Sequence, residues 1–167
     1  MSIEAWLAFV AASTILVMIP GPTVLLVVSY ALGQGWRAAL PTAIGVALGD
    51  FTAVTLSLLG VGALLATSAT LFTVLKLAGA AYLIWLGIKL WRAGGSLQTE
   101  ARTDRATSLA MVAHAWIVTA LNPKSIIFFV AFMPQFIDPR GDVLKQMIIL
   151  GATFLVIAFA NALAYGF

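Results

Sequence analysis

Long runs of apolar residues, separated by short polar stretches, dominate this chain. Five runs can be drawn, and each is long enough to cross the hydrocarbon core of a bilayer as an α-helix. They cover about residues 5–31, 38–65, 71–91, 108–137 and 146–166. Helices are required because lipid offers no hydrogen-bond partners to backbone N–H and C=O groups, which a helix pairs internally. The pattern predicts an all-α polytopic membrane protein with five transmembrane segments in a single domain over residues 1–167.

The amino-acid composition supports a membrane protein and limits the kinds of functional site that the chain could contain. Of the 167 residues, 62% are hydrophobic and 9% are charged, whereas a typical soluble domain has about 25% charged residues. The chain has no cysteine, which excludes disulfides and thiolate metal sites. The one histidine, His114, has no ligand partners at metal-site spacing and is expected to pack structurally. We therefore expect no metal and no cofactor, and the small net charge of +3 gives no reason to expect nucleic-acid binding.

The charged residues indicate the orientation. Most of them gather in two stretches, 89–107 and 138–145, and the first carries an excess of lysine and arginine. The positive-inside rule then predicts a cytoplasmic loop over 92–107. Following the chain back from this loop, one span at a time, places Arg37 inside and the N-terminus outside. Following it forward places residues 138–145 outside. A first or fourth segment that turned back within the membrane would change this assignment.

Two of the five segments are interrupted by proline in a matching way. The interruptions are Pro20-Gly21-Pro22 in the first segment and Asn122-Pro123-Lys124 in the fourth. A shift of 101 residues superimposes Pro22 on Pro123 and predicts an internal repeat, with units over about 5–91 and 108–167. Three spans per unit, an odd number, would invert the second unit. Proline alone often kinks membrane helices, but matched interruptions in inverted halves indicate a transporter's binding site.

The same repeat predicts that the second unit is incomplete. With the 101-residue shift, residue 167 corresponds to position 66, at the end of the second segment. The partner of the third segment, 71–91, would be a sixth segment. We expect a 3+3 inverted repeat with the sixth segment missing here, or else a natural five-span protein.

Asp50 is the strongest single candidate for chemistry, because it lies near the middle of the second apolar segment. An acid there costs on the order of 2.5–3.5 kcal/mol on insertion scales and is usually functional. We expect a proton-coupling or cation site. The alternative is a structural hydrogen bond to a neighbouring helix.

The interruptions themselves are expected to bind substrate. Half-helices beginning at Thr23 and Lys124 would offer unpaired backbone N–H groups to a carboxylate, and Lys124 would add positive charge. Lys124 could instead pair with Asp50, or extend to the membrane interface. The predicted substrate-binding residues are Pro20, Gly21, Pro22, Thr23, Asn122, Pro123 and Lys124.

Glycine spacing predicts where helices approach closely. Gly45 and Gly49 form a GxxxG match next to Asp50, and Gly79 and Gly87 lie eight residues apart on one face of the third segment. Such spacing is common at packing contacts between membrane helices. Close approach at Gly45 and Gly49 would also supply Asp50 with neighbours.

The chain contains five short motifs in a fixed order, and the similarity that they carry runs from about residue 5 to the end. They are Pro20-Gly21-Pro22, Gly45-x-x-x-Gly49-Asp50, Lys76-x-x-Gly79-Ala80-Ala81-Tyr82-Leu83-x-x-x-Gly87, Leu121-Asn122-Pro123-Lys124 and Phe132-Met133-Pro134-Gln135-Phe136. This set resembles the LysE/RhtB family of amino-acid exporters. The resemblance implies a multi-pass protein of the bacterial inner membrane that exports amino acids or close derivatives, driven by the proton gradient, and that forms a homodimer. Family members have six segments, so this chain departs from the family in length.

The sequence therefore favours a secondary transporter that works by proton antiport. A passive small-solute channel or facilitator is the alternative, since it would need the same spans but no titrating acid. An intramembrane enzyme is disfavoured, because the chain offers no thiol, no metal-ligand set and no convincing serine–histidine arrangement. A scaffold subunit would need neither Asp50 nor two matched interruptions. The identity of the exported amino acid stays open.

Overall fold

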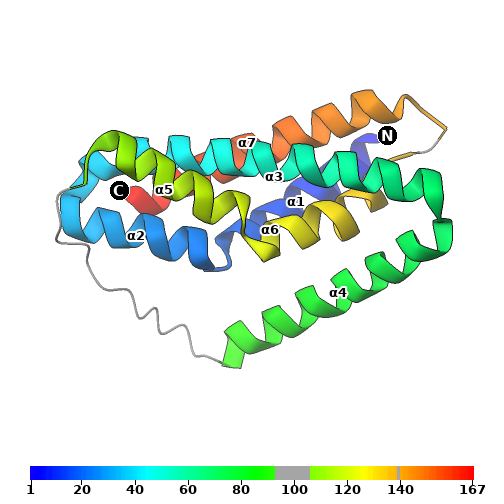
Figure 1. Ribbon diagram of the computed structural model, residues 1–167, viewed down its shortest axis with the longest axis horizontal. Coiled ribbons are helices and arrows are strands. Elements are labelled where there is room, and N and C mark those ends of the chain that lie inside the picture. Colours follow the sequence, from blue (N-terminus) through cyan, green and yellow to red (C-terminus); the bar gives the residue numbers. More distant parts are fainter. Residues whose placement is uncertain (93–105, 139) are drawn as a thin grey trace.

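A computed structural model describes residues 1–92, 106–138 and 140–167, and several side chains within 61–91 lie outside the described set. Within these parts every regular element is helical, as the apolar pattern predicted. Figure 1 shows most helices lying side by side along one long axis, with α4 diverging from the others. The predicted loop over 92–107 falls largely outside the described residues.

The described helices include membrane-length elements. Two stretches, Pro22–Gly60 and Val143–Gly166, are long and apolar enough to cross a bilayer. A third candidate arises if the bent pair Ser108–Ala120 and Pro123–Phe136 forms one span. These findings agree with a polytopic membrane protein, whereas the count of five spans and the internal repeat stay predictions.

The first apolar run is two helices, α1 (Ile3–Met18) and α2 (Pro22–Gln34). The Ser2 side chain caps α1 by accepting a hydrogen bond from the Ala5 amide. Pro20 disfavours helical backbone at the preceding residue, and Ile19 is extended, with φ −68° and ψ 118°. Pro22 then occupies the first position of α2, where its missing N–H costs nothing.

The fourth run is broken in the same manner. It consists of α5 (Ser108–Ala120) and α6 (Pro123–Ile127), and α6 continues into a wide π turn and a tight 3₁₀ turn, η2 (Phe128–Phe132) and η3 (Met133–Phe136). The two parts meet at an angle of 45°. Asn122 caps the second part, because its side chain accepts a hydrogen bond from the Lys124 amide.

The remaining helices join and cover the broken ones. They are η1 (Gly35–Ala38), α3 (Ala39–Thr67), α4 (Ala69–Arg92) and α7 (Val143–Gly166). In Figure 1 the first run and α4 point one way along the long axis, and α3 points the other way. The fourth run is antiparallel to the first, and α7 is antiparallel to α3. An inverted second unit requires this alternation.

Helix α3 packs against α5 and α7, and glycine permits the contact with α5. A Cβ atom added at Gly49 would lie 2.5 Å from the Thr119 Cβ, and one added at Gly45 would collide with the Val112 carbonyl oxygen. The structure thus places both glycines in the contact between α3 and α5. Gly79 and Gly87 lie in α4, at positions whose surroundings are outside the described residues.

Two apolar clusters flank the level of the helix breaks. An aromatic cluster includes Phe9, Phe128, Phe129 and Phe154, and the rings of Phe129 and Phe154 meet edge to face with centroids 4.7 Å apart. A cluster of small side chains contains Val27, Ala43, Val46, Ala115 and Ala162. Along α3, Asp50 lies between the residues of these two clusters.

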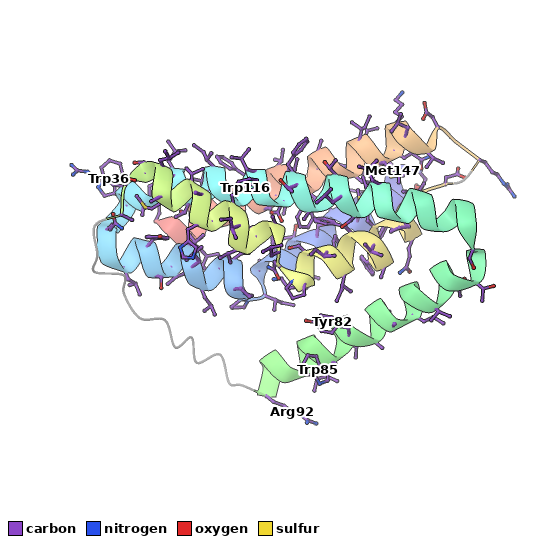
Figure 2. All side chains as sticks on the ribbon, in the orientation of Figure 1. Trp36, Tyr82, Trp85, Arg92, Trp116 and Met147 are labelled. Atoms are coloured by element: carbon purple, nitrogen blue, oxygen red, sulfur yellow. The ribbon has the colours of Figure 1, made fainter. Side chains whose placement is uncertain are left out.

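The outside of the bundle is apolar as well. Leu56 is 64% exposed and Val156 is 69% exposed. Figure 2 shows Trp36 and Trp116 on the outside, where they are 67% and 43% exposed. Soluble monomers rarely expose apolar surface of this extent, and such surface is typical of contact with a membrane.

Candidate functional site

The two helix breaks lie against each other. The Asn122 amide nitrogen donates to the Thr23 hydroxyl over 3.1 Å, and the hydroxyls of Thr23 and Thr119 share a hydrogen bond of 3.2 Å. Figure 1 shows both interruptions near the middle of the long axis. Residues about one hundred positions apart therefore form one polar centre.

Lys124 links the second break to the first. Its side chain is only 8% exposed, and its Nζ donates to the carbonyl oxygens of Leu16 at 3.0 Å and Ile19 at 2.8 Å. A Cβ atom at Gly21 would lie 3.4 Å from the same Nζ. Lys124 thus binds the end of α1 instead of extending to a membrane interface.

One expectation about this residue is wrong. The backbone N–H of Lys124 donates to the Asn122 side-chain oxygen over 3.0 Å. That donor is therefore engaged by the helix cap and is not free for a substrate carboxylate. The side chain of Asn122 bridges the breaks, since its nitrogen reaches Thr23 while its oxygen caps α6.

Helix α7 supplies two further polar residues that the sequence reasoning missed. The Asn161 amide nitrogen donates to the Val17 carbonyl over 3.1 Å, and the Tyr165 hydroxyl donates to the Met18 carbonyl over 3.0 Å. They are four residues apart and so project from one face of α7. Both are polar residues inside the last apolar run, but neither carries the charge that marks Asp50 and Lys124 in the sequence.

The last turn of α1 is consequently satisfied by side chains. A helix end leaves its final carbonyl groups without intrahelical donors, and in lipid each such group is costly. Here four successive carbonyls receive donors from α6 and α7. The pairs are Leu16 and Ile19 with Lys124, Val17 with Asn161, and Met18 with Tyr165.

Asp50 faces this centre from α3 and is 3% exposed. No hydrogen bond or ion pair joins its carboxylate to another residue in the described parts of the chain. Lys124 lines the same cavity as Asp50. The structural hydrogen bond considered as an alternative is therefore not found among the described residues.

These groups line a small cavity between the two breaks, α3 and α7. Its polar lining consists of Thr23, Asp50, Asn122, Lys124, Ser125, Asn161 and Tyr165. Its apolar lining includes Val24, Val27, Val46, Phe154, Ala158 and Ala162. Pro20, Gly21, Pro22 and Pro123 are not among the lining residues; they shape the breaks that place the others.

The remaining sequence candidates lie elsewhere. His114 Nδ1 is 3.1 Å from the Tyr30 hydroxyl and does not line the cavity. Within the described residues no group of three or more histidine, cysteine or acidic side chains could hold a metal ion. The side chain of Lys76 lies outside the described residues.

Comparisons with known proteins agree with the motif resemblance. A membrane protein of Vibrio cholerae described as uncharacterized is 38% identical over 157 residues, covering 94% of this chain and 77% of the relative. A homoserine/homoserine lactone efflux protein of Salmonella typhimurium is 37% identical over 157 residues, covering 94% and 76%. A leucine efflux protein of an Enterobacter species is 32% identical over 153 residues, covering 90% and 72%. No solved structure matches the chain.

The Salmonella and Enterobacter relatives are both described as efflux proteins. The family profile described as LysE type translocator matches residues 14–167, which include both breaks, Asp50 and the α7 donors. The chain therefore belongs to the LysE-type translocator family of membrane proteins.

Proposed function

We propose that this protein is a secondary transporter that exports an amino acid or a close derivative across the bacterial inner membrane in exchange for protons. The observation that carries the proposal is the cavity between two broken helices, with Asp50 buried in its wall and without a partner in the described part of the chain. Matched interruptions of this kind are typical of transporter substrate sites. The efflux relatives, named for homoserine and homoserine lactone and for leucine, give the substrate class.

The cavity suits a small amino acid without a charged side chain. Its polar groups gather at the breaks, while Val24, Val46 and Ala158 provide an apolar wall for an aliphatic substituent. A zwitterion needs partners for both charges, because burying an unpaired charge is costly. The cavity supplies one acidic and one basic residue, Asp50 and Lys124.

Asp50 is the proton-coupling residue in this mechanism. It takes a proton when the cavity faces the outside and releases it when the cavity faces the cytoplasm. Alternating access then moves substrate outward as protons move inward. The orientation follows from the basic loop 92–107 in the cytoplasm and the N-terminus outside. In Figure 1 the N-terminus and the turn between α3 and α4 lie toward the same end of the long axis, which supports this pairing of ends.

The assembly belongs to the same proposal. We propose five spans in the given chain, arranged as two units of an inverted repeat over about 5–91 and 108–167. We also propose a homodimer in the membrane. The apolar outer surface supports immersion in lipid, and it offers area for a second copy.

Everted membrane vesicles from cells expressing the full chain test the transport function. In such vesicles export appears as uptake, and respiration acidifies the interior. We expect radiolabelled leucine or homoserine to accumulate when respiration is active, and an uncoupler to abolish the accumulation. Uptake that only equilibrates, and that ignores the uncoupler, would instead establish the passive facilitator. Uptake equal to that of vesicles without the protein would contradict both.

A further inference from the structure

The carbonyl groups at the end of α1 are held by two different kinds of donor. Neutral groups on α7, the side chains of Asn161 and Tyr165, bind the carbonyls of Val17 and Met18. A single ammonium group, that of Lys124, binds the other two. It lies between the Leu16 oxygen at 3.0 Å and the Ile19 oxygen at 2.8 Å. The structure therefore contains a position for a primary ammonium next to the cavity.

The surroundings of this position favour a cation. The C-terminus of a helix carries the negative end of its dipole, and two carbonyl oxygens of α1 converge on one point. Asp50 lines the same cavity and has no partner among the described residues. The charge of Lys124 is thus held by backbone oxygens, while the carboxylate that could hold it remains unpaired.

We propose that the Leu16 and Ile19 carbonyls form the binding site for the ammonium group of the substrate. Lys124 is a tethered cation that occupies this site between substrates. The identification of the ligand as an amino acid rests on the proposed function above. When a substrate ammonium enters, Lys124 leaves the carbonyls and turns into the cavity, where it can pair with the substrate carboxylate and with Asp50. Its long flexible stem permits this movement, and Gly21 presents no side chain where Nζ lies.

This arrangement makes binding a competition between two ammonium groups. A ligand without an amino group cannot displace Lys124, whereas a simple primary amine of similar shape can. Removing the tethered cation should raise the affinity for amines, because the site would no longer be occupied from within. If Lys124 occupies the site about 90% of the time, its removal tightens amine binding about tenfold.

The absence of native cysteine allows a reversible test on the full chain. In Lys124→Cys, methanethiosulfonate reagents attach either a neutral methyl group or an ethylammonium group, which restores a tethered cation. Calorimetry then measures the binding of isopentylamine, the amine that corresponds to leucine without its carboxyl group. We expect about tenfold tighter binding in the free and methylated forms than in the wild type. The ethylammonium form should return toward the wild-type affinity.

Lys145→Cys is the matched control, because Lys145 is exposed in the first turn of α7. Neither reagent should change amine binding in this variant. Equal amine affinity in all three forms of Lys124→Cys would overturn the proposal. Because the same folded protein is compared before and after modification, misfolding cannot mimic the expected pattern.

The wild type provides a second test that does not depend on any variant. Leucine should bind to the purified protein and isopentylamine should compete with it, whereas 4-methylpentanoate, which lacks the amino group, should compete at least tenfold more weakly. Equal competition by 4-methylpentanoate would contradict the ammonium site even if Lys124→Cys failed to fold. Amine binding requires no transport. A failure of proton-driven export would therefore refute the proposed function, but the competition by isopentylamine and 4-methylpentanoate would still test the ammonium site.

Discussion

The Lys124 ammonium lies 2.8 Å from the carbonyl oxygen of Ile19, although 105 residues separate them along the chain. One residue follows the proline of the second break, and the other precedes the proline of the first. The two interruptions are therefore parts of one structure, in which Lys124 of the second break donates to carbonyl groups that the first break leaves without helical donors. This interdependence explains why the site cannot be divided between the two halves of the chain.

Replacing Asp50 with asparagine should abolish proton-coupled export while leaving the fold intact. The amide has nearly the same shape but cannot take up and release a proton in the transport cycle. We expect respiration-driven uptake into everted vesicles to fall at least tenfold. Glu4→Gln, which neutralises an exposed acid at the start of α1, should transport like the wild type. Unchanged coupled uptake in Asp50→Asn would remove Asp50 from the coupling mechanism.

Replacing Gly49 with alanine should separate α3 from α5. The added Cβ would lie 2.5 Å from the Thr119 Cβ and 2.8 Å from the Trp116 carbonyl oxygen. Overpacking of this kind typically costs about 1–3 kcal/mol, so thermal unfolding of the purified protein should begin at a clearly lower temperature. Gly60→Ala is the control in the same helix, because nothing lies within 4 Å of a Cβ there. Equal melting temperatures for the two variants would contradict the close contact.

Removing the Tyr165 hydroxyl should destabilise the end of α1. In Tyr165→Phe the Met18 carbonyl loses its donor, which lies 3.0 Å away in the wild type. An unsatisfied polar group costs about 1–3 kcal/mol when it is buried. Because this bond is exposed, we expect an effect at the lower end of that range. Tyr82→Phe on α4, a residue seen in Figure 2 outside this cluster, should leave the melting temperature unchanged. A Tyr165→Phe variant as stable as the wild type would show that the bond contributes nothing.

Replacing Thr23 with valine should uncouple the two breaks. The hydroxyl accepts from Asn122 and shares a hydrogen bond with Thr119, and valine keeps the shape without either bond. We expect about tenfold slower uptake, which corresponds to roughly 1.4 kcal/mol. Thr23→Ser retains the hydroxyl and should recover most of the rate. Equal rates for valine and serine would show that the link between the breaks is not needed for transport.

The sequence was sufficient to predict the helices and their interruptions. The apolar run at 146–166 became Val143–Gly166, and the proline positions marked where α1 and α5 end. These features follow from local rules, because lipid demands helices and proline removes a helical donor. They need no knowledge of which segments meet.

The partners at the site could not be predicted in this way. Lys124, Asn161 and Tyr165 bind backbone carbonyls, and a carbonyl group has no signature in the sequence. The Lys124 amide was expected to be free, but the neighbouring Asn122 side chain caps it. Both outcomes depend on how segments approach in space. Asp50 could be found from sequence because a buried carboxylate in an apolar run is unusual wherever its neighbours lie.

The side-chain donors at the end of α1 also change what the cavity requires from water. A helix that ends inside a membrane needs donors for its last carbonyl groups, and where water supplies them, drying would weaken the helix. Here lysine, asparagine and tyrosine side chains take the place of those waters. The broken helix therefore keeps its shape whether the cavity is hydrated or dry. A carrier that opens to water on each side in turn, and closes between, passes through both conditions in every cycle.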